Sequence, residues 1–364
     1  MKIKEISHFL EEIAPISSQE SYDNSGLIIG DGDMEVSGVL ISLDCIEKVV
    51  DEAIDKGCNL IISHHPIVFS GLKKLNGKNY IERTVLKAIK NDIAIYAMHT
   101  NLDNYRFGVN FEIGSRLGLK NMQILAPKKN VLSKLVVFVP KEYSEKVSKT
   151  IFEAGAGVIG NYSNCSFSSN GIGTFLPENG AIPFEGEVGK TSVVNEVRLE
   201  VLVSNHKISK VLEAMIEAHP YEEVAHEVYP VSNMNQDEGA GMIGELEEAI
   251  ETSMFFRSLK EKFNCGVIRH TDFVRSKVKK IAFCGGAGSF LLESAKRKGA
   301  DVFITGDFKY HEFFDAENQL VIADIGHFES EQFTSFQLAT ILTKKFPKFA
   351  VHLTEVNTNP INYF

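Results

Sequence analysis

The sequence is poor in the features that mark secreted, membrane-spanning and nucleic-acid-binding proteins. Its five cysteines are far apart and form no CxxC pair, which is typical of reduced thiols in a cytosolic protein: Cys45, Cys58, Cys165, Cys265 and Cys284. No apolar run approaches the ~20 residues that a membrane-spanning helix needs, and residues 1–15 resemble an amphipathic helix, not a signal peptide. The formal net charge of -10 disfavours unspecific binding to nucleic acid or to an anionic membrane. We therefore expect a cytoplasmic protein with neither of these partners.

The chain has 364 residues, of which 44% are hydrophobic and 24% charged, so it can form two globular domains or one domain with a large insert. The first part alternates strands and helices: strand 36–44, helix 45–57, strand 58–63, helix 80–92 and strand 93–98. The last part does the same: strand 278–288, helix 289–299, strand 300–307, helix 309–319 and strand 320–331. This alternation predicts an α/β fold with a mostly parallel sheet, and the likeness of the two parts suggests an internal duplication.

The middle of the chain follows a different order of elements. Strand 132–140, helix 141–155, strand 165–177, strand 196–204, helix 207–218 and strand 222–231 give a βαββαβ series. That series is the ferredoxin-like arrangement. We therefore predict a first half-domain over 1–127, an inserted domain over 128–232 and a second half-domain over 233–364, with a polar linker at 232–241.

Two adjacent histidines end a strand in "CNLIISHHPIVF", residues 58–69. Neighbouring side chains of a regular strand point to opposite faces, so His64 and His65 could each bind one ion of a close pair only where the chain turns away. The alternative is a polar strand end with two solvated imidazoles.

Other strand ends carry the same kinds of side chain. His99 and Asp103, four residues apart, follow one strand; His327 and Glu331 follow another, and His311 lies near a third. Ligands of parallel sheets bind beyond the carboxyl ends of the strands, and histidine with carboxylate suits zinc, manganese or ferrous iron. Taken singly, His99 could be a satisfied strand-end residue, His311 a surface residue and Glu331 a helix-terminus charge. The matching positions in both halves favour a metal site.

Five motifs resemble those of the Nif-three-like dinuclear-metal family, also labelled type 2 homologues of GTP cyclohydrolase I. They are "YDNSGLIIGD", "SHHPIVF", "HTNLDNYRFGVN", "TGDFKYHE" and "GHFESE". The resemblance implies two divalent ions bound by His64, His65, Asp103, His327 and Glu331. It also implies proton-handling roles for His99 and His311, a toroidal homohexamer, and a PII- or CutA-like insert.

The function that follows from the resemblance is a metal-dependent hydrolase acting on a purine nucleotide such as GTP. The alternative is a non-catalytic metal-binding or regulatory scaffold whose insert senses a ligand.

Weaker signals lie elsewhere in the chain. The loop 284–290, "CGGAGSF", could cradle an anion or form a tight turn. Asp23 and Asn24 could reach the metal pocket or shape a turn. In the insert, four residues invite either a ligand-binding or a structural explanation: His219, Tyr221, Glu223 and His226. The aromatic carboxyl end, 354–364, is expected to dock on the core or on a neighbouring subunit.

Overall fold

The computed structural model describes residues 1–364, and these form two compact units. The first unit combines Met1–Pro127 with Asp237–Phe364, and the second is Lys128–Gln236. None of the helices is both long enough and apolar enough to cross a bilayer. The chain is of mixed α/β type with three sheets, two in the first unit and one in the second.

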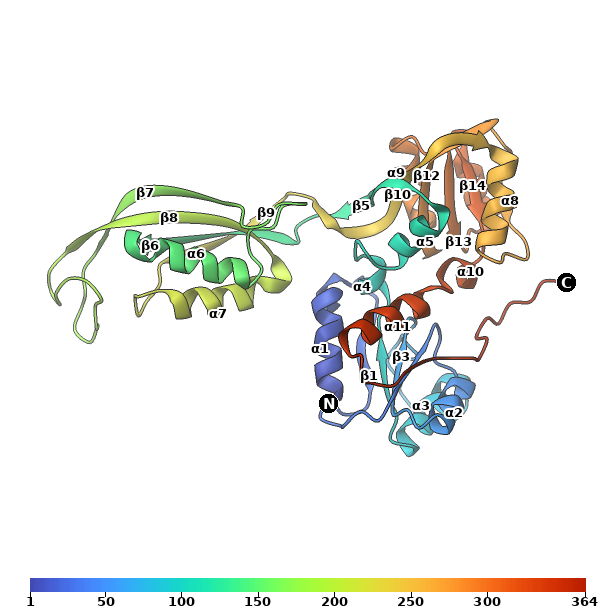
Figure 1. The fold of residues 1–364 in the computed structure, drawn as a ribbon, viewed down its shortest axis with the longest axis horizontal. Coiled ribbons are helices and arrows are strands. Elements are labelled where there is room, and N and C mark those ends of the chain that lie inside the picture. Colours follow the sequence, from blue (N-terminus) through green and yellow to red (C-terminus); the bar gives the residue numbers. More distant parts are fainter. The chain divides into compact units, whose positions relative to one another are not determined.

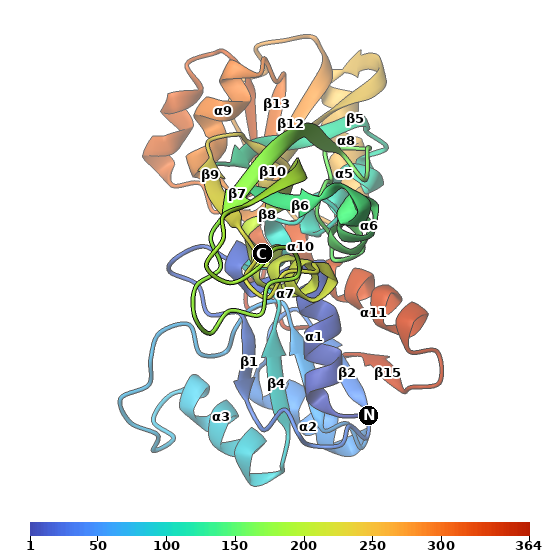
Figure 2. The same cartoon turned by 90° about the vertical axis from the view of Figure 1, so that its left-hand side faces the viewer.

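One sheet of the first unit has the strand order β1-β4-β3-β2-β15. Figure 2 labels β1, β4, β2 and β15 of this sheet. Its strands are β1 (Gly26–Ile29), β2 (Val39–Ser42), β3 (Leu60–Ser63), β4 (Ala94–Ala97) and β15 (Val351–Leu353). All are parallel except β1. Every residue of β2, β3 and β4 is buried, because helices cover both faces of the sheet. Helices α1 (Ile3–Ile13) and α11 (Thr334–Lys345) pack on one face, and α2 (Glu47–Asp55) and α3 (Tyr80–Lys90) on the other.

The other sheet of this unit has the order β11-β14-β13-β12-β10-β5. Its strands are β5 (Lys120–Lys128), β10 (Asn235–Glu251), β11 (Arg269–His270), β12 (Lys277–Ala287), β13 (Val302–Gly306) and β14 (Val321–Asp324). The central strands β12, β13 and β14 are parallel. Helices α5 (Val109–Leu117) and α8 (Thr252–Lys262) cover one face, and α9 (Leu292–Arg297) covers the other.

The two sheets of the first unit exchange edge strands. Strand β5 comes before the second unit in sequence but lies in the sheet built from residues after it, whereas β15, near the carboxyl end, joins the sheet built from the first residues. One continuous apolar core joins both sheets. The predicted polar linker at 232–241 is wrong for most of its length, because β10 begins at Asn235 and its backbone groups pair within a sheet.

The second unit is a four-stranded antiparallel sheet with two helices on one face (Figure 1). Its elements are β6 (Leu132–Pro140), α6 (Ser144–Glu153), β7 (Ser166–Phe175), β8 (Ser192–Ser204), α7 (Ile208–Ala218) and β9 (His226–Val231). The strand order is β7-β8-β6-β9. The helices bury Val147, Ile151, Val211 and Met215 against alternate residues of β6 and β8. The opposite face of the sheet carries no helix.

Short helices complete the chain. They are η1 (Ile16–Ser18), α4 (Thr100–Asp103), η2 (Lys141–Tyr143), η3 (Asn205–Lys207), η4 (Ser289–Leu291), η5 (Tyr310–Ala316) and α10 (His327–Glu331). Residues 309–319 were predicted as a regular helix, and most of that stretch forms the 3-10 helix η5.

Candidate metal centre

The carboxyl edges of both parallel sheets meet at one group of side chains in the first unit. His64 and His65 directly follow β3, His99 caps α4 after β4, and His327 begins α10 after β14. Asp103 and Glu331 are the last residues of α4 and α10. The two four-residue spacings in the sequence therefore both fall on a short helical turn, which brings their members to one face.

Three imidazoles of this group are anchored through the same ring nitrogen. Nδ1 of His64 lies 2.6 Å from the carbonyl oxygen of Met98, and Nδ1 of His65 lies 2.7 Å from Asp44 Oδ1. Nδ1 of His327 lies 2.7 Å from Asp307 Oδ2. A carbonyl or carboxylate oxygen can only accept, so each Nδ1–H donates. The neutral rings then carry a lone pair on Nε2, the form in which histidine binds a metal.

These Nε2 atoms converge on the carboxylate of Glu331. Its Oε2 lies 3.0 Å from His65 Nε2 and 3.1 Å from His327 Nε2, and its Oε1 lies 3.7 Å from His64 Nε2. The Nε2 atoms of His65 and His327 are 3.3 Å apart. Lone pairs and an anionic carboxylate at such distances repel one another unless a cation or a proton lies between them.

Two atoms of the group are buried and have no hydrogen-bond partner, His64 Nε2 and Asp103 Oδ1. They lie 3.6 Å apart. A buried polar atom left unpaired costs about 1–3 kcal/mol, so such a pair needs an explanation. A divalent ion between them provides one, and nitrogen and oxygen donors without a thiolate suit zinc, iron or manganese. Ligand atoms of His64, His65 and Glu331 all lie within 4.8 Å of one another, so the residues fit a metal site.

The carboxylates and imidazoles shift one another's pKa. Desolvation lowers the pKa of His65, but hydrogen bonds with Asp44 and Glu331 outweigh it and raise that pKa to about 10. Burial and the Glu331 charge likewise act in opposite directions on His327, whose pKa rises to about 11. Burial, followed by repulsion from Glu331, raises the pKa of Asp103 to about 7. Burial opposes ionisation of Glu331, but the charge of His327 prevails and holds the pKa of Glu331 well below its usual value. In the absence of metal, protons therefore occupy the places of cations.

The glycine-rich carboxyl end of β12 leaves room for the carboxylate of Glu331. Gly286 has φ of +60°, and a Cβ atom at this residue would lie 2.5 Å from Glu331 Oε1. Only glycine combines this conformation with that closeness. The amides of Gly285, Gly286 and Gly288 donate to the side chains of Asn110, Ser330 and Thr305. The segment "CGGAGSF" thus serves as a tight turn behind the ligand group, and the amides of its three glycines are already used in hydrogen bonds.

His99 lies beside the ligand group without joining it. Its ring centroid is 5.5 Å from that of His64 and 5.4 Å from that of His65, and its Nδ1 lies 2.6 Å from Asp23 Oδ1. Burial works against ionisation of Asp23, but its hydrogen bonds with His99 and Thr100 lower its pKa. The sequence-based suggestion that Asp23 reaches the metal pocket therefore holds through His99.

A cavity of about 370 Å³ opens beside these residues. Its lining includes three of the histidines and part of the carboxyl-terminal segment: His65, His99, His327, Asn359, Pro360 and Ile361. The carboxyl-terminal segment therefore docks on the core, and Thr358 Oγ1 donates to Asp44 Oδ2 at 2.6 Å.

The structure does not bring His311 to this group. Its side chain is exposed on η5, where its ring packs against Tyr310 and Phe314. The sequence reasoning also missed two residues, Asp44 and Asp307, which hold His65 and His327. Each is the last residue of a strand predicted from the sequence, 36–44 or 300–307, so the strand-end rule that found the histidines could have found them.

In the insert, His219 has a structural role. Its Nε2 lies 3.0 Å from the carbonyl oxygen of Phe138, and its Nδ1 accepts from the amide of Tyr221. Both ring nitrogens are thus used in fixing the turn after α7.

The sequence matches the Duf34/NIF3 (NGG1p interacting factor 3) family over residues 1–360. The chain belongs to this family. This confirms the resemblance seen in its motifs. A Bacillus subtilis relative described as "GTP cyclohydrolase 1 type 2 homolog" is 40% identical over 99% of this chain and 98% of its own. A Staphylococcus aureus relative with the same description is 36% identical over the whole of both chains. The crystal structure of a Bacillus cereus protein related to NIF3 is 40% identical, with a TM-score of 0.88 over 100% of this chain and 99% of that one.

Proposed function

We propose that this NIF3-family protein is a metal-dependent hydrolase with a dinuclear divalent-metal centre, acting on GTP or a related purine nucleotide. The observation that carries the proposal is the convergence of three histidine Nε2 atoms on the buried carboxylate of Glu331, an arrangement that calls for cations. The descriptions of the relatives support the nucleotide class, because they name a GTP cyclohydrolase homologue.

Two ions account for the donor atoms better than one. Glu331 Oε1 faces His64, whose Nε2 also faces Asp103, whereas Glu331 Oε2 faces His65 and His327. The proposed ligands therefore fall into two sets that share Glu331. A single ion bound by one set would leave the nitrogen and oxygen lone pairs of the other set facing one another without a cation between them. Zinc, iron and manganese all suit such nitrogen and oxygen donors.

The remaining residues would bind substrate and move protons. Two bound ions would supply Lewis acidity, which activates water and polarises an electrophile. His99, oriented by Asp23, lines the cavity beside the ligand group and would exchange a proton between the reacting groups and solvent. In hydrolytic opening of a purine imidazole ring, water adds to the ring carbon and a nitrogen takes up a proton as the C–N bond breaks. The ring of His311 packs against Tyr310 and Phe314, not against the ligand group. We therefore assign the proton transfer to His99 and use His311 as the position of a control variant.

Further parts of the proposal concern the fold and assembly. The repeated strand–helix alternation supports a duplicated metal-binding domain, and the βαββαβ series of the second unit supports a ferredoxin-like insert. A homohexameric, toroidal and cytoplasmic protein is proposed from the family resemblance.

The alternative function is a non-catalytic metal-binding or regulatory scaffold with a ligand-sensing insert, which the cavity in the insert favours.

Metal analysis followed by an activity screen tests the proposal. The gently purified protein should contain two divalent ions per chain, and the metal-defined protein should hydrolyse a nucleotide or a related phosphoester. His99→Ala should keep its metal and lose turnover by roughly 100-fold, the usual size for an acid–base group. His311→Ala, the matched control, should behave like the wild type. One ion per chain would contradict the dinuclear centre, and unchanged turnover in His99→Ala would contradict its proton transfer.

A further inference from the structure

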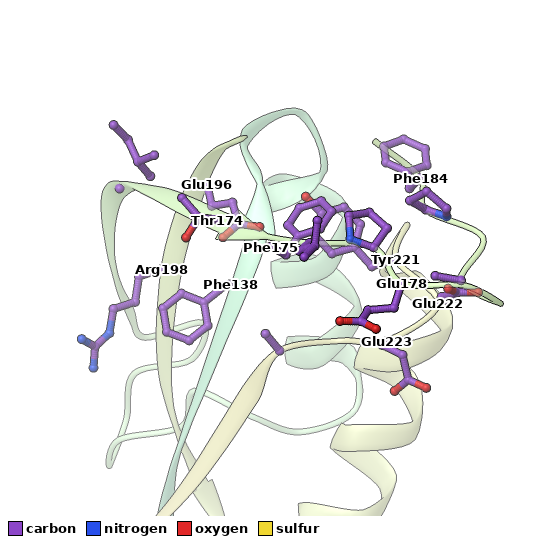
Figure 3. A pocket seen from close by; sticks show the side chains of 18 of the residues that line it. Phe138, Thr174, Phe175, Glu178, Phe184, Glu196, Arg198, Tyr221, Glu222 and Glu223 are labelled. Carbon is purple, nitrogen blue, oxygen red and sulfur yellow. The ribbon is translucent and has the colours of Figure 1, made fainter. Parts of the chain in front are cut away.

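A cavity of about 580 Å³ lies within the second unit, on the sheet face that carries no helix (Figure 3). Its lining comes from β6, β7, β8, the loop 176–184 and the turn after α7. Small-molecule sites typically have volumes of about 300–1,000 Å³, so this cavity has the size for an organic ligand. All of its lining residues belong to the second unit, and none is a proposed metal ligand.

Aromatic rings form the wall of this cavity. Phe175 and Phe184 each lie against Tyr221, with ring centroids 5.8 and 6.1 Å apart, and Phe138 also lines the space. The loop that carries Phe184 is fixed at this place, because the amide of Ile182 donates to Glu222 Oε1 at 2.7 Å. The wall is therefore a built part of the fold and offers several ring faces to an occupant.

The charged side chains around the cavity are mostly negative. Four glutamates line it: Glu178, Glu196, Glu222 and Glu223. The single cation among the lining residues, Arg198, pairs with Glu200 at 3.1 Å, and its side chain extends away from Tyr221 in Figure 3. Carboxylates and aromatic faces together attract cations, since a ring face carries a negative quadrupole. The Tyr221 hydroxyl is buried beside the carboxylate of Glu196, so this end of the aromatic wall is itself next to a negative charge.

The floor of the cavity is bare backbone at one residue. A Cβ atom added at Gly171 would meet no atom within 4 Å, and the backbone there does not have a positive φ. At Gly173, by contrast, an added Cβ would lie 2.1 Å from Glu196 Oε2. A side chain at Gly171 can thus enter the cavity without displacing the sheet.

We propose that this cavity binds a small organic ammonium ion with an apolar or aromatic body. The rings would hold the apolar part and the face of the ammonium group, and the glutamates would neutralise its charge. An anion or a nucleotide phosphate does not fit this site, because its carboxylates would repel the ligand. The inference is separate from the metal centre and does not depend on hydrolysis.

Titration of the full-length protein with phenethylammonium tests the proposal. Calorimetry should show saturable binding of phenethylammonium with one site per chain. The neutral analogue 2-phenylethanol should bind at least tenfold more weakly, and the anion 3-phenylpropanoate should not bind. Raising the salt concentration should weaken the ammonium complex, because part of the attraction is electrostatic.

Variants locate the binding. Gly171→Leu should abolish it, and the double variant Glu178→Gln with Glu223→Gln should weaken it by about tenfold. Ser168→Val, in the same strand but on its opposite face, is the matched control and should bind like the wild type. Metal content should be equal in all of these proteins.

Other outcomes overturn the proposal. Equal binding of all three probes, preference for the anion, or no binding of phenethylammonium would reject the ligand class. Unchanged binding in Gly171→Leu would reject the location. Tight binding of a lysine-rich peptide without binding of phenethylammonium would make the cavity a peptide groove instead.

Discussion

His65 and His327 are held through Nδ1 by aspartates from strand ends, Asp44 in one sheet and Asp307 in the other. The side chains of His65 and Asp44 are 22% and 30% exposed, whereas those of His327 and Asp307 are 34% and 49% exposed. Asp44 is also fixed by Thr358, and its neighbour His64 is fully buried. The same aspartate–histidine pair thus occurs twice, once in a less exposed position supported by Thr358 and once nearer to solvent. The comparison suggests that the first sheet fixes the site and that the second gives access to it.

The largest expected effect is on Glu331, which the two halves share. Glu331→Gln keeps the size of the side chain but removes the charge that faces three histidines, so both of the proposed ions should be lost. Elemental analysis of the purified variant measures this. Glu329→Gln, two residues away on the same helix and also buried, is the control and should retain its metal. Retention of two ions by Glu331→Gln would show that the halves bind metal independently.

The second-largest expected effect is a loss of metal affinity that differs between the two aspartate–histidine pairs. Asp44→Asn and Asp307→Asn each remove a charge that orients a histidine, a change that usually costs 10–100-fold in metal affinity. We expect Asp44→Asn near the upper end of that range and Asp307→Asn near the lower end, since solvent screens the exposed pair. Competition with a chelator gives both values. Equal losses would remove the distinction between a braced and an exposed half.

Metal affinity should rise with pH. The pKa values of His65 and His327 are raised to about 10 and about 11 without metal, so metal entry must release protons. Each proton released makes the affinity about tenfold higher per pH unit. In the metal-free protein, the stability of the fold should fall with rising pH, opposite to the change in metal affinity. The raised pKa values of these histidines contribute stability that is complete below about 6.5. It is lost as the pH rises towards about 10 for His65 and about 11 for His327. Titrations with zinc between pH 6 and 9, and melting of the metal-free protein over the same range, check both signs.

The smallest effect is expected for removal of the insert. Replacing residues 129–234 by a short glycine–serine link leaves β5 and β10 complete and removes no member of the ligand group. Metal content should stay within about twofold of the wild type, because ion binding depends on donor atoms in the first unit alone. Elemental analysis of the soluble variant tests this. Loss of metal from a folded product would mean that the second unit contributes to the site.

The sequence predicts the central strands of both sheets well. Strands β2, β3, β4, β13 and β14 are short, mostly apolar runs, and each ends in a polar residue or is followed by one within two residues. This pattern arises from burial on both faces. The strand-end rule then brings the histidines and carboxylates together, because it depends only on sheet direction. The exchange of β5 and β15 could not be predicted in this way. Packing between distant segments decides which strand an edge strand pairs with. The residue patterns of β5 and β15 do not indicate their partners. The position of His311 could not be predicted for a similar reason: its closeness in sequence to a strand end says nothing about the direction of the 3-10 helix that carries it.

The position of β15 has a consequence for the order of events during synthesis. This strand pairs Val351 with Val39, and Thr358, a few residues later, supports Asp44. Contacts between residues so distant in sequence form late and slowly, because a long chain must first be brought together. A ribosome therefore releases nearly the whole protein before the first sheet receives its last strand. The edge of the first sheet that carries the proposed ligands reaches its final form only after the carboxyl-terminal residues emerge. In incomplete chains Asp44, which holds His65, therefore lacks its hydrogen bond from Thr358.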